Sequence, residues 1–218
     1  MGPIRRNEEA DVPKGYADVV ASQGHFHELR DLLVARAEAL SGAAAVEALQ
    51  DAAIVERNHL SDDGAAVGLL DAALEVGDDW FTLRLLREMH YRTQDWGKLT
   101  DILDRMTKLG DGARSARCKV EEGRIRESEL KDLDGASNAY REAFAFDDTF
   151  MDALLARQRV AILQKDQEGL ANLYTSQAQK TTAANACFWW LRAARALHSH
   201  DEQQTEYSYR KAIENAGP

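Results

Sequence analysis

One sequence motif recurs along this chain of 218 residues. It is clearest at Asp132–Phe144, where a turn containing Asp and Gly leads into a helix with small and aromatic residues three and four positions apart. Asp62–Leu74 is a second copy of the motif, and Tyr209–Ile213 matches the end of it. Such a turn and helix form the second half of a helical hairpin, and several copies in one chain indicate a repeat architecture.

The residues between these copies predict an all-α fold. The chain has three prolines, Pro3, Pro13 and Pro218, so none interrupts a helix between residues 14 and 217. Ala, Leu, Glu, Arg and Gln, which are strong helix formers, fill that span. The Val-, Ile- and Thr-rich alternation expected of strands is absent.

The spacing of turns and apolar residues predicts about twelve helices in antiparallel pairs. One apolar pattern, with spacings of three, one and three, begins at Leu29, Leu99 and Leu170, so its copies lie 70 and 71 residues apart. Second helices are expected to start near residues 24, 63, 95, 134, 167 and 202, in units alternating near 39 and 32 residues. Each follows a helix at roughly 16–22, 43–60, 79–93, 112–131, 150–165 or 184–199. Residues 1–14 are expected to be a polar lead-in, and 15–218 one helical repeat domain.

These pairs resemble tetratricopeptide repeats. Ala136, Tyr140 and Ala143 match the alanine–aromatic–alanine triplet of that family's second helix, and Trp96–Leu99 is similar to its aromatic–leucine element. Asp79 and Asp148 stand where the family often has proline. The resemblance covers roughly residues 16–216 and implies an α-solenoid, a right-handed superhelix whose concave face is formed mainly by first helices.

Charge and composition restrict the partners and the compartment. The net charge is −10, with an acidic excess in residues 1–73, so the chain does not suit a nucleic acid backbone. No apolar run approaches the length of a membrane span, and the first residues lack the apolar core of a signal peptide. Cys118 and Cys187 do not make a disulfide framework and are expected to be buried thiols. We therefore expect a cytoplasmic protein with no membrane or nucleic acid partner.

The sequence offers no catalytic or metal site. Residues two apart on a helix point about 200° apart, so neither His25 with His27 nor His198 with His200 can chelate from one face. No cysteine or carboxylate cluster completes a zinc set, and no nucleophile elbow or phosphate-binding glycine loop occurs. We expect no metal, no cofactor and no enzymatic activity.

Arginines and aromatic residues on the predicted first helices are the candidate binding site. Arg binds carboxylates through two hydrogen bonds and Trp supplies contact area, so the favoured ligand is an acidic segment of a protein or peptide. The alternative is a solvated face on which the arginines pair with Glu88, Glu121 and Glu122 at helical spacing. The candidate residues are Arg84, Tyr91, Arg92, Arg117, Arg124, Arg159 and Trp190.

The sequence thus predicts a non-enzymatic scaffold that binds a partner segment on its concave face. Two alternatives stay open: a structural or oligomerisation module of a larger assembly, and a regulatory repeat domain of a longer enzyme. The last helix carries no polar cap after it, and solenoids need such a cap, so the array is expected to continue in a longer protein or to self-associate through its C-terminal end. Of the adjacent Trp189 and Trp190, one is expected to be exposed or at an interface, and the other in the core.

Overall fold

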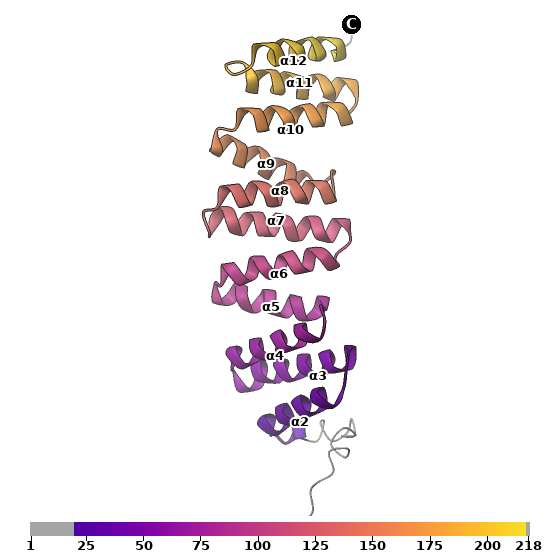
Figure 1. Ribbon diagram of the computed structural model, residues 1–218, viewed down its shortest axis with the longest axis vertical. Helices are drawn as coiled ribbons and strands as arrows, with labels where there is room; N and C mark the ends of the chain where they lie inside the picture. The colour runs from indigo at the N-terminus through magenta and orange to yellow at the C-terminus, as the bar shows by residue number, and fades with distance from the viewer. Residues whose placement is uncertain (1–19, 217–218) are drawn as a thin grey trace, which may run out of the picture. The chain divides into compact units, whose positions relative to one another are not determined.

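The computed structural model describes residues 20–216, and over this range the chain is all-α, as predicted. The helices run back and forth with short turns between them (Figure 1). The predicted lead-in, residues 1–14, and most of the predicted helix 16–22 lie outside the described residues. The elements are α2 (Phe26–Ala39), α3 (Ala43–Val55), a π-helical turn η2 (Glu56–Leu60), α4 (Asp63–Val76), α5 (Trp80–Thr93), α6 (Trp96–Leu109), α7 (Gly112–Ser128), α8 (Leu133–Phe146), α9 (Met151–Gln164), α10 (Gln167–Lys180), α11 (Ala183–Leu197) and α12 (Glu202–Asn215).

Each of the helices α2 to α12 starts within two residues of its predicted position, because an aspartate marks most of the starts. The aspartate carboxylate accepts a hydrogen bond from the backbone N–H of the residue three positions later, which satisfies one of the unpaired donors of the first turn. Every second helix after α2 has this cap, at Asp62, Asp95, Asp132, Asp166 and Asp201. These caps lie 33 to 37 residues apart, a narrower spread than the predicted 39 and 32.

The chain divides into two compact units between Asp111 and Gly112. In unit 1, α2, α3 and α4 pack in succession, and α5 pairs with α6. Leu83 and Leu86 of α5 and Leu99 and Leu103 of α6 are completely buried. Leu99 and Leu103 belong to the apolar pattern that the sequence predicted for α6, and Leu83 and Leu86, three residues apart, lie on one side of α5 in the same way.

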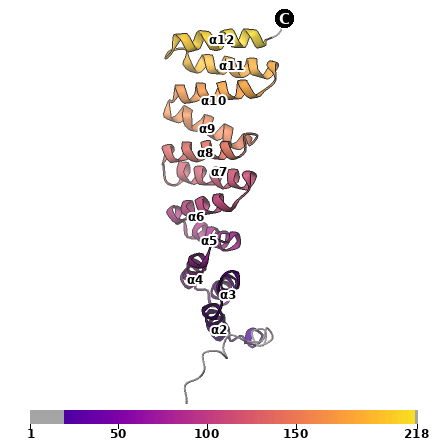
Figure 2. The ribbon, with the colours of Figure 1, turned by 45° about the vertical axis from the view of Figure 1, so that its right-hand side comes forward.

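Unit 2 contains α7 to α12 (Figure 2). Three helix pairs pack extensively: α7 with α8, α10 with α11, and α11 with α12. Helix α9 packs on α8 more than on α10, whereas the sequence paired it with α10. The α8 residues Ala136, Tyr140 and Ala143 are completely buried. They provide the packing between helices that the family resemblance implied.

Helices α7 and α8 approach each other closely where Tyr140 meets α7. A Cβ atom added at Gly123 of α7 would stand 2.5 Å from a ring carbon of Tyr140, so only glycine fits there without a shift. Small residues facing a large aromatic one are typical of close helix pairs. The helix pairs are therefore tetratricopeptide-like, as predicted, and the right-handed superhelix stays a prediction.

Candidate functional site

Three of the seven candidate residues, all on α5, line one hollow of unit 1. Leu83, Leu86 and Met89 bury one side of α5, so residues three and four positions apart on the other side face solvent. The hollow has a volume of about 500 Å³ and is lined by Arg84, Arg87, Glu88, Tyr91 and Arg92. Arg87 and Glu88 were not among the predicted site residues, although their spacing on α5 places them on the same face.

Local contacts hold the side chains of this hollow. The Arg84 guanidinium lies 5.0 Å from the centre of the Phe81 ring, a cation–π contact. Tyr91 is 59% exposed and packs edge-on against Trp96, with ring centres 5.8 Å apart. Arg92 forms an ion pair of 3.6 Å with Asp63 of α4. The hollow thus presents guanidinium groups around an accessible aromatic ring.

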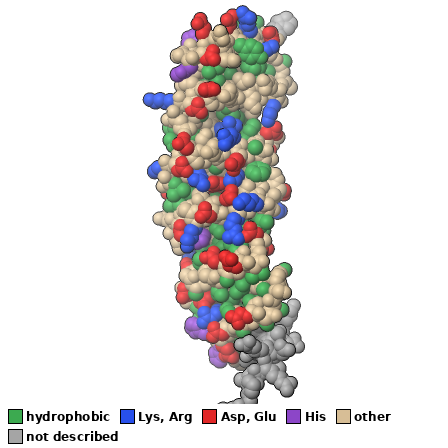
Figure 3. Space-filling view, viewed as in Figure 1, with side chains coloured by type: hydrophobic (Ala, Val, Ile, Leu, Met, Phe, Trp, Pro, Cys, Tyr) green, Lys and Arg blue, Asp and Glu red, His purple; other side chains and the backbone are tan. Residues whose placement is uncertain are grey.

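In unit 2 the candidates Arg124 and Arg159 bind carboxylates of neighbouring helices, and the candidate Arg117 is exposed on α7. Arg124 of α7 donates to Asp152 of α9 at 3.2 Å. Arg159 of α9 donates two hydrogen bonds to Glu127 of α7, at 2.8 and 2.6 Å. Carboxylates thus bind Arg124 and Arg159, but they are Asp152 and Glu127 of other helices and not the residues at helical spacing that the alternative named. Charged side chains of both signs are interspersed on the face seen in Figure 3.

Arg159 belongs to a network that joins three helices. The Tyr140 hydroxyl of α8 donates to Glu127 at 2.9 Å, and Arg159 binds the same carboxylate. The hydrogen bond from Arg159 lowers the pKa of Glu127, whereas burial raises the pKa of Tyr140. Because both oxygens of Glu127 are engaged, this arrangement fixes α7, α8 and α9 together.

Trp190 is a core residue, which corrects its prediction as a surface contact. It is 5% exposed and packs in a cluster with Ala178, Ala186 and Ala212. Its neighbour Trp189 is half-buried, so neither tryptophan is exposed; Phe188 is the exposed member of the run. Successive residues of a helix are rotated by about 100°, so Phe188, Trp189 and Trp190 point in different directions, and only Trp190 lies on the buried side of α11.

Sequence reasoning missed a buried ionic cluster between α7 and α8. Lys119 and Glu122 are almost completely buried, and Lys119 lies 2.9 Å from Glu122 and from Glu142. Arg126 binds Glu122 at 2.8 Å and Asp132 at 3.0 Å. The signal was present, because Lys119, Glu122 and Arg126 repeat at three and four residues on one face of α7.

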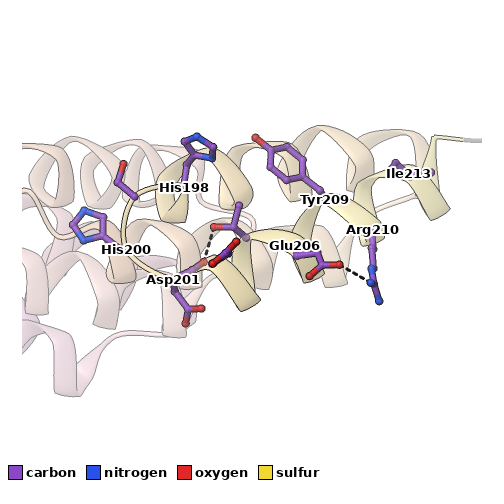
Figure 4. Close-up of a pocket in the computed structure, with 10 residues that line it drawn as sticks. His198, His200, Asp201, Glu206, Tyr209, Arg210 and Ile213 are labelled. Carbon is purple, nitrogen blue, oxygen red and sulfur yellow. Dashed lines mark hydrogen bonds and ion pairs between the residues drawn. The ribbon is translucent and has the colours of Figure 1, made fainter.

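A second hollow, of about 690 Å³, lies at the turn from α11 to α12 (Figure 4). His198 and His200 come from the turn, while Tyr209, Arg210 and Ile213 come from the exposed face of α12. Within residues 20–216 no three His, Cys, Asp or Glu side chains lie close enough together to hold a metal ion. None of the helices described is long and apolar enough to cross a membrane.

Comparison with known proteins gives distant likenesses to solved structures. No family model and no curated protein sequence matches the chain. A double mutant of MamA from strain RS-1 has 14% identity and a TM-score of 0.46, with 91% of this chain and 99% of that chain covered. PilF of Pseudomonas aeruginosa has 16% identity and a TM-score of 0.41, with 93% and 90% covered. At these values the tetratricopeptide-like assignment rests on the helix pairs of this chain, and the likenesses assign no function.

Proposed function

We propose that this protein is a non-enzymatic scaffold that binds an acidic segment of a partner protein in the α5 hollow. The observation that carries the proposal is the gathering of Arg84, Arg87, Tyr91 and Arg92 around one hollow of unit 1. A volume of about 500 Å³ falls within the range of binding pockets and accommodates a few side chains of a peptide. In the cell we place the protein in the cytoplasm, on the sequence argument alone.

The chemistry of the hollow favours carboxylates beside an apolar or aromatic side chain. A guanidinium group binds a carboxylate through two parallel hydrogen bonds, and a tyrosine ring supplies rigid contact area. Arg84 and Arg92 are eight residues apart on α5, which corresponds to about 12 Å along the helix. An extended peptide spans that distance with about four residues, so two glutamates at positions i and i+4 are the favoured spacing.

Direct binding measurements test this proposal. Fluorescence anisotropy would compare a labelled peptide with Glu at i and i+4 with its Gln counterpart. We expect the Glu peptide to bind more tightly, and the double variant Arg84→Glu with Arg92→Glu to weaken it at least about tenfold, because two attractive contacts become repulsive. The control is Arg210→Glu on α12, which makes the same charge change outside the hollow. Equal binding of both peptides, or an unchanged affinity in the double variant, would contradict the proposal.

Self-association through the C-terminal end is a second candidate function. The observation that favours it is Ile213, which is 75% exposed on α12, with Tyr207 also exposed on that helix. Exposed apolar residues of this size are common at interfaces between proteins. Light scattering tests it: a dimer that Ile213→Glu returns to a monomer supports the candidate, and a monomer at high concentration contradicts it.

A further inference from the structure

Helix α9 carries an arginine in the middle of its buried side. Arg157 lies three or four residues from Ala153, Leu154, Val160 and Ala161, and all four of these side chains are buried. Arg157 itself is half-buried, and burial lowers its pKa because the guanidinium loses contact with water. Charges that proteins take out of water are normally paired with an opposite charge. Among the described side chains of residues 20–216, however, Arg157 has neither an ion pair nor a hydrogen bond.

A second arginine, Arg141 of α8, faces Arg157. Gln164 of α9 donates to Asp134 of α8 at 2.6 Å, and this bond sets the register of the two antiparallel helices. Arg141 lies seven residues after Asp134 and Arg157 seven residues before Gln164, and seven residues make about two turns of helix. The two arginines therefore come to the same place on the same face, and the charge of Arg141 lowers the pKa of Arg157 further. Arg141 also lacks a carboxylate partner within the described part of the chain.

A third hydrogen-bond donor comes from α10. Ala161 of α9 packs in one cluster with Leu170 and Tyr174 of α10. Arg157 lies one turn before Ala161 and Gln177 one turn after Tyr174, so the antiparallel helices place Arg157 and Gln177 opposite each other. The Nε2 atom of Gln177 is buried and has no hydrogen-bond partner among the described residues. A buried donor is unfavourable unless some group accepts its hydrogen.

We propose that Arg141, Arg157 and Gln177 bind a phosphate group between α8, α9 and α10. A phosphate group supplies three acceptor oxygens and about 1.5 to 2 negative charges near pH 7, which matches two guanidinium groups. A carboxylate supplies two oxygens and one charge, so it would leave one guanidinium uncompensated. The site lies on the packing side of α9, in the other unit from the α5 hollow, and takes a different ligand. The inference therefore goes beyond the proposed function.

The site also accounts for the packing of α9, which is weaker on α10 than on α8. A charged side chain in the middle of the buried side of α9 disfavours close apolar packing there, because the guanidinium keeps its need for hydrogen bonds. A bound phosphate group would neutralise Arg157 and join α9 to α10 through Gln177. Binding would then stabilise unit 2, because the ligand binds the folded chain and not the unfolded one.

Isothermal titration calorimetry of the full chain with inorganic phosphate, in a chloride buffer, measures binding directly. We expect a single site. Arg157→Met and Arg141→Met each remove a guanidinium but keep most of the side-chain length, and each should weaken binding at least about tenfold. Gln177→Leu removes one neutral donor and should weaken it about threefold to tenfold. The control is Arg210→Met, an exposed position of α12 outside the site, which should leave the affinity unchanged.

Thermal unfolding followed by circular dichroism separates binding from packing. Phosphate at about ten times its dissociation constant should raise the midpoint temperature of the parent by about 3 to 6 °C over chloride at equal ionic strength. Arg157→Met should abolish most of this rise. In chloride alone, Arg157→Met should be at least as stable as the parent, because it removes a half-buried charge that has no opposite charge beside it.

A parallel titration with phosphoserine identifies the source of the phosphate group. Tighter binding of inorganic phosphate assigns the site to the free ion, and tighter binding of phosphoserine assigns it to a phosphate ester; in both cases Arg157→Met must weaken the binding. Absence of binding by either compound, or equal affinity in the parent and in both arginine variants, would overturn the inference. So would an undiminished rise of the midpoint in Arg157→Met, or a loss of stability of that variant in chloride alone.

Discussion

Replacing Gly123 by alanine tests the close packing of α7 against the Tyr140 ring of α8. Gly123 lies inside α7, where alanine would normally stabilise a helix by about 1 kcal/mol. The added methyl carbon, however, would stand 2.5, 2.7 and 2.8 Å from three carbons of the Tyr140 ring. Carbon atoms pack at about 3.5 to 4.0 Å, so the ring has to move by roughly an ångström.

The Tyr140 ring has little room for that movement. It is completely buried in a cluster with Val120, Ala136 and Leu173, and its hydroxyl is bound to Glu127. Overpacking of a core costs about 1 to 3 kcal/mol, and a ring fixed at both ends favours the upper value. After the helix gain of about 1 kcal/mol is subtracted, Gly123→Ala should lower the free energy of unfolding by about 2 kcal/mol.

Gly68 supplies the matched control. It also lies inside a helix, α4, but an added Cβ there meets nothing within 4 Å. Gly68→Ala should therefore raise the free energy of unfolding by about 0.5 to 1 kcal/mol. Urea unfolding followed by circular dichroism measures both variants, and hydrogen exchange of α7 and α8 localises the loss. If Gly123→Ala stabilises the protein as much as Gly68→Ala, the contact with Tyr140 is not as close as described.

Three further predictions concern the charges of unit 2. Asp132→Ala removes the cap of α8 and should cost about 1 kcal/mol in urea unfolding, while the same change in the exposed Asp134 of that helix should cost less. Lys119→Met leaves the buried Glu122 with fewer partners and should lower the free energy of unfolding by about 3 kcal/mol; an unchanged midpoint would contradict the buried pair. The pKa of Glu127 lies below its ordinary value, so the stabilisation that Glu127 gives is complete above that ordinary value and is lost as pH falls through the lowered pKa. Urea unfolding at a series of pH values should therefore show a smaller loss of stability over this pH range in Arg159→Met than in the parent.

Much of the fold follows from local sequence signals. Aspartate and glycine in turns, apolar residues at three and four positions, and the absence of internal proline together locate the starts of helices α2 to α12 within two residues. The same signals do not say how strongly neighbouring helices pack. Helix α9 illustrates the difference: its start after Asp147–Thr149 was predicted, but its stronger packing on α8 than on α10 depends on side chains of both neighbours.

The candidate site was predictable only where one helix supplies all its members. Arg84, Tyr91 and Arg92 lie on α5, and helical spacing alone places them on one face. Trp190 lies in a run of three bulky residues, where composition does not reveal which member faces the core. The arc of α11 that faces α12 decides that, and it is set by tertiary packing.

The arginines of unit 2 show which information a single helix lacks. A search for charged partners three and four residues away finds only residues on the same helix. Many side-chain pairs of this fold instead join residues 26 to 32 positions apart, slightly less than one repeat. In a stacked array, residues about one repeat apart in the sequence lie side by side, so a neighbouring helix supplies the partner. A search of the sequence for opposite charges at this separation would have found Arg124 with Asp152 and Arg159 with Glu127. The pairs at this separation include Arg30–Glu56, Gln50–Asp79, Arg105–Asp78, Arg124–Asp152, Arg159–Glu127, Gln164–Asp134 and Lys180–Asp148.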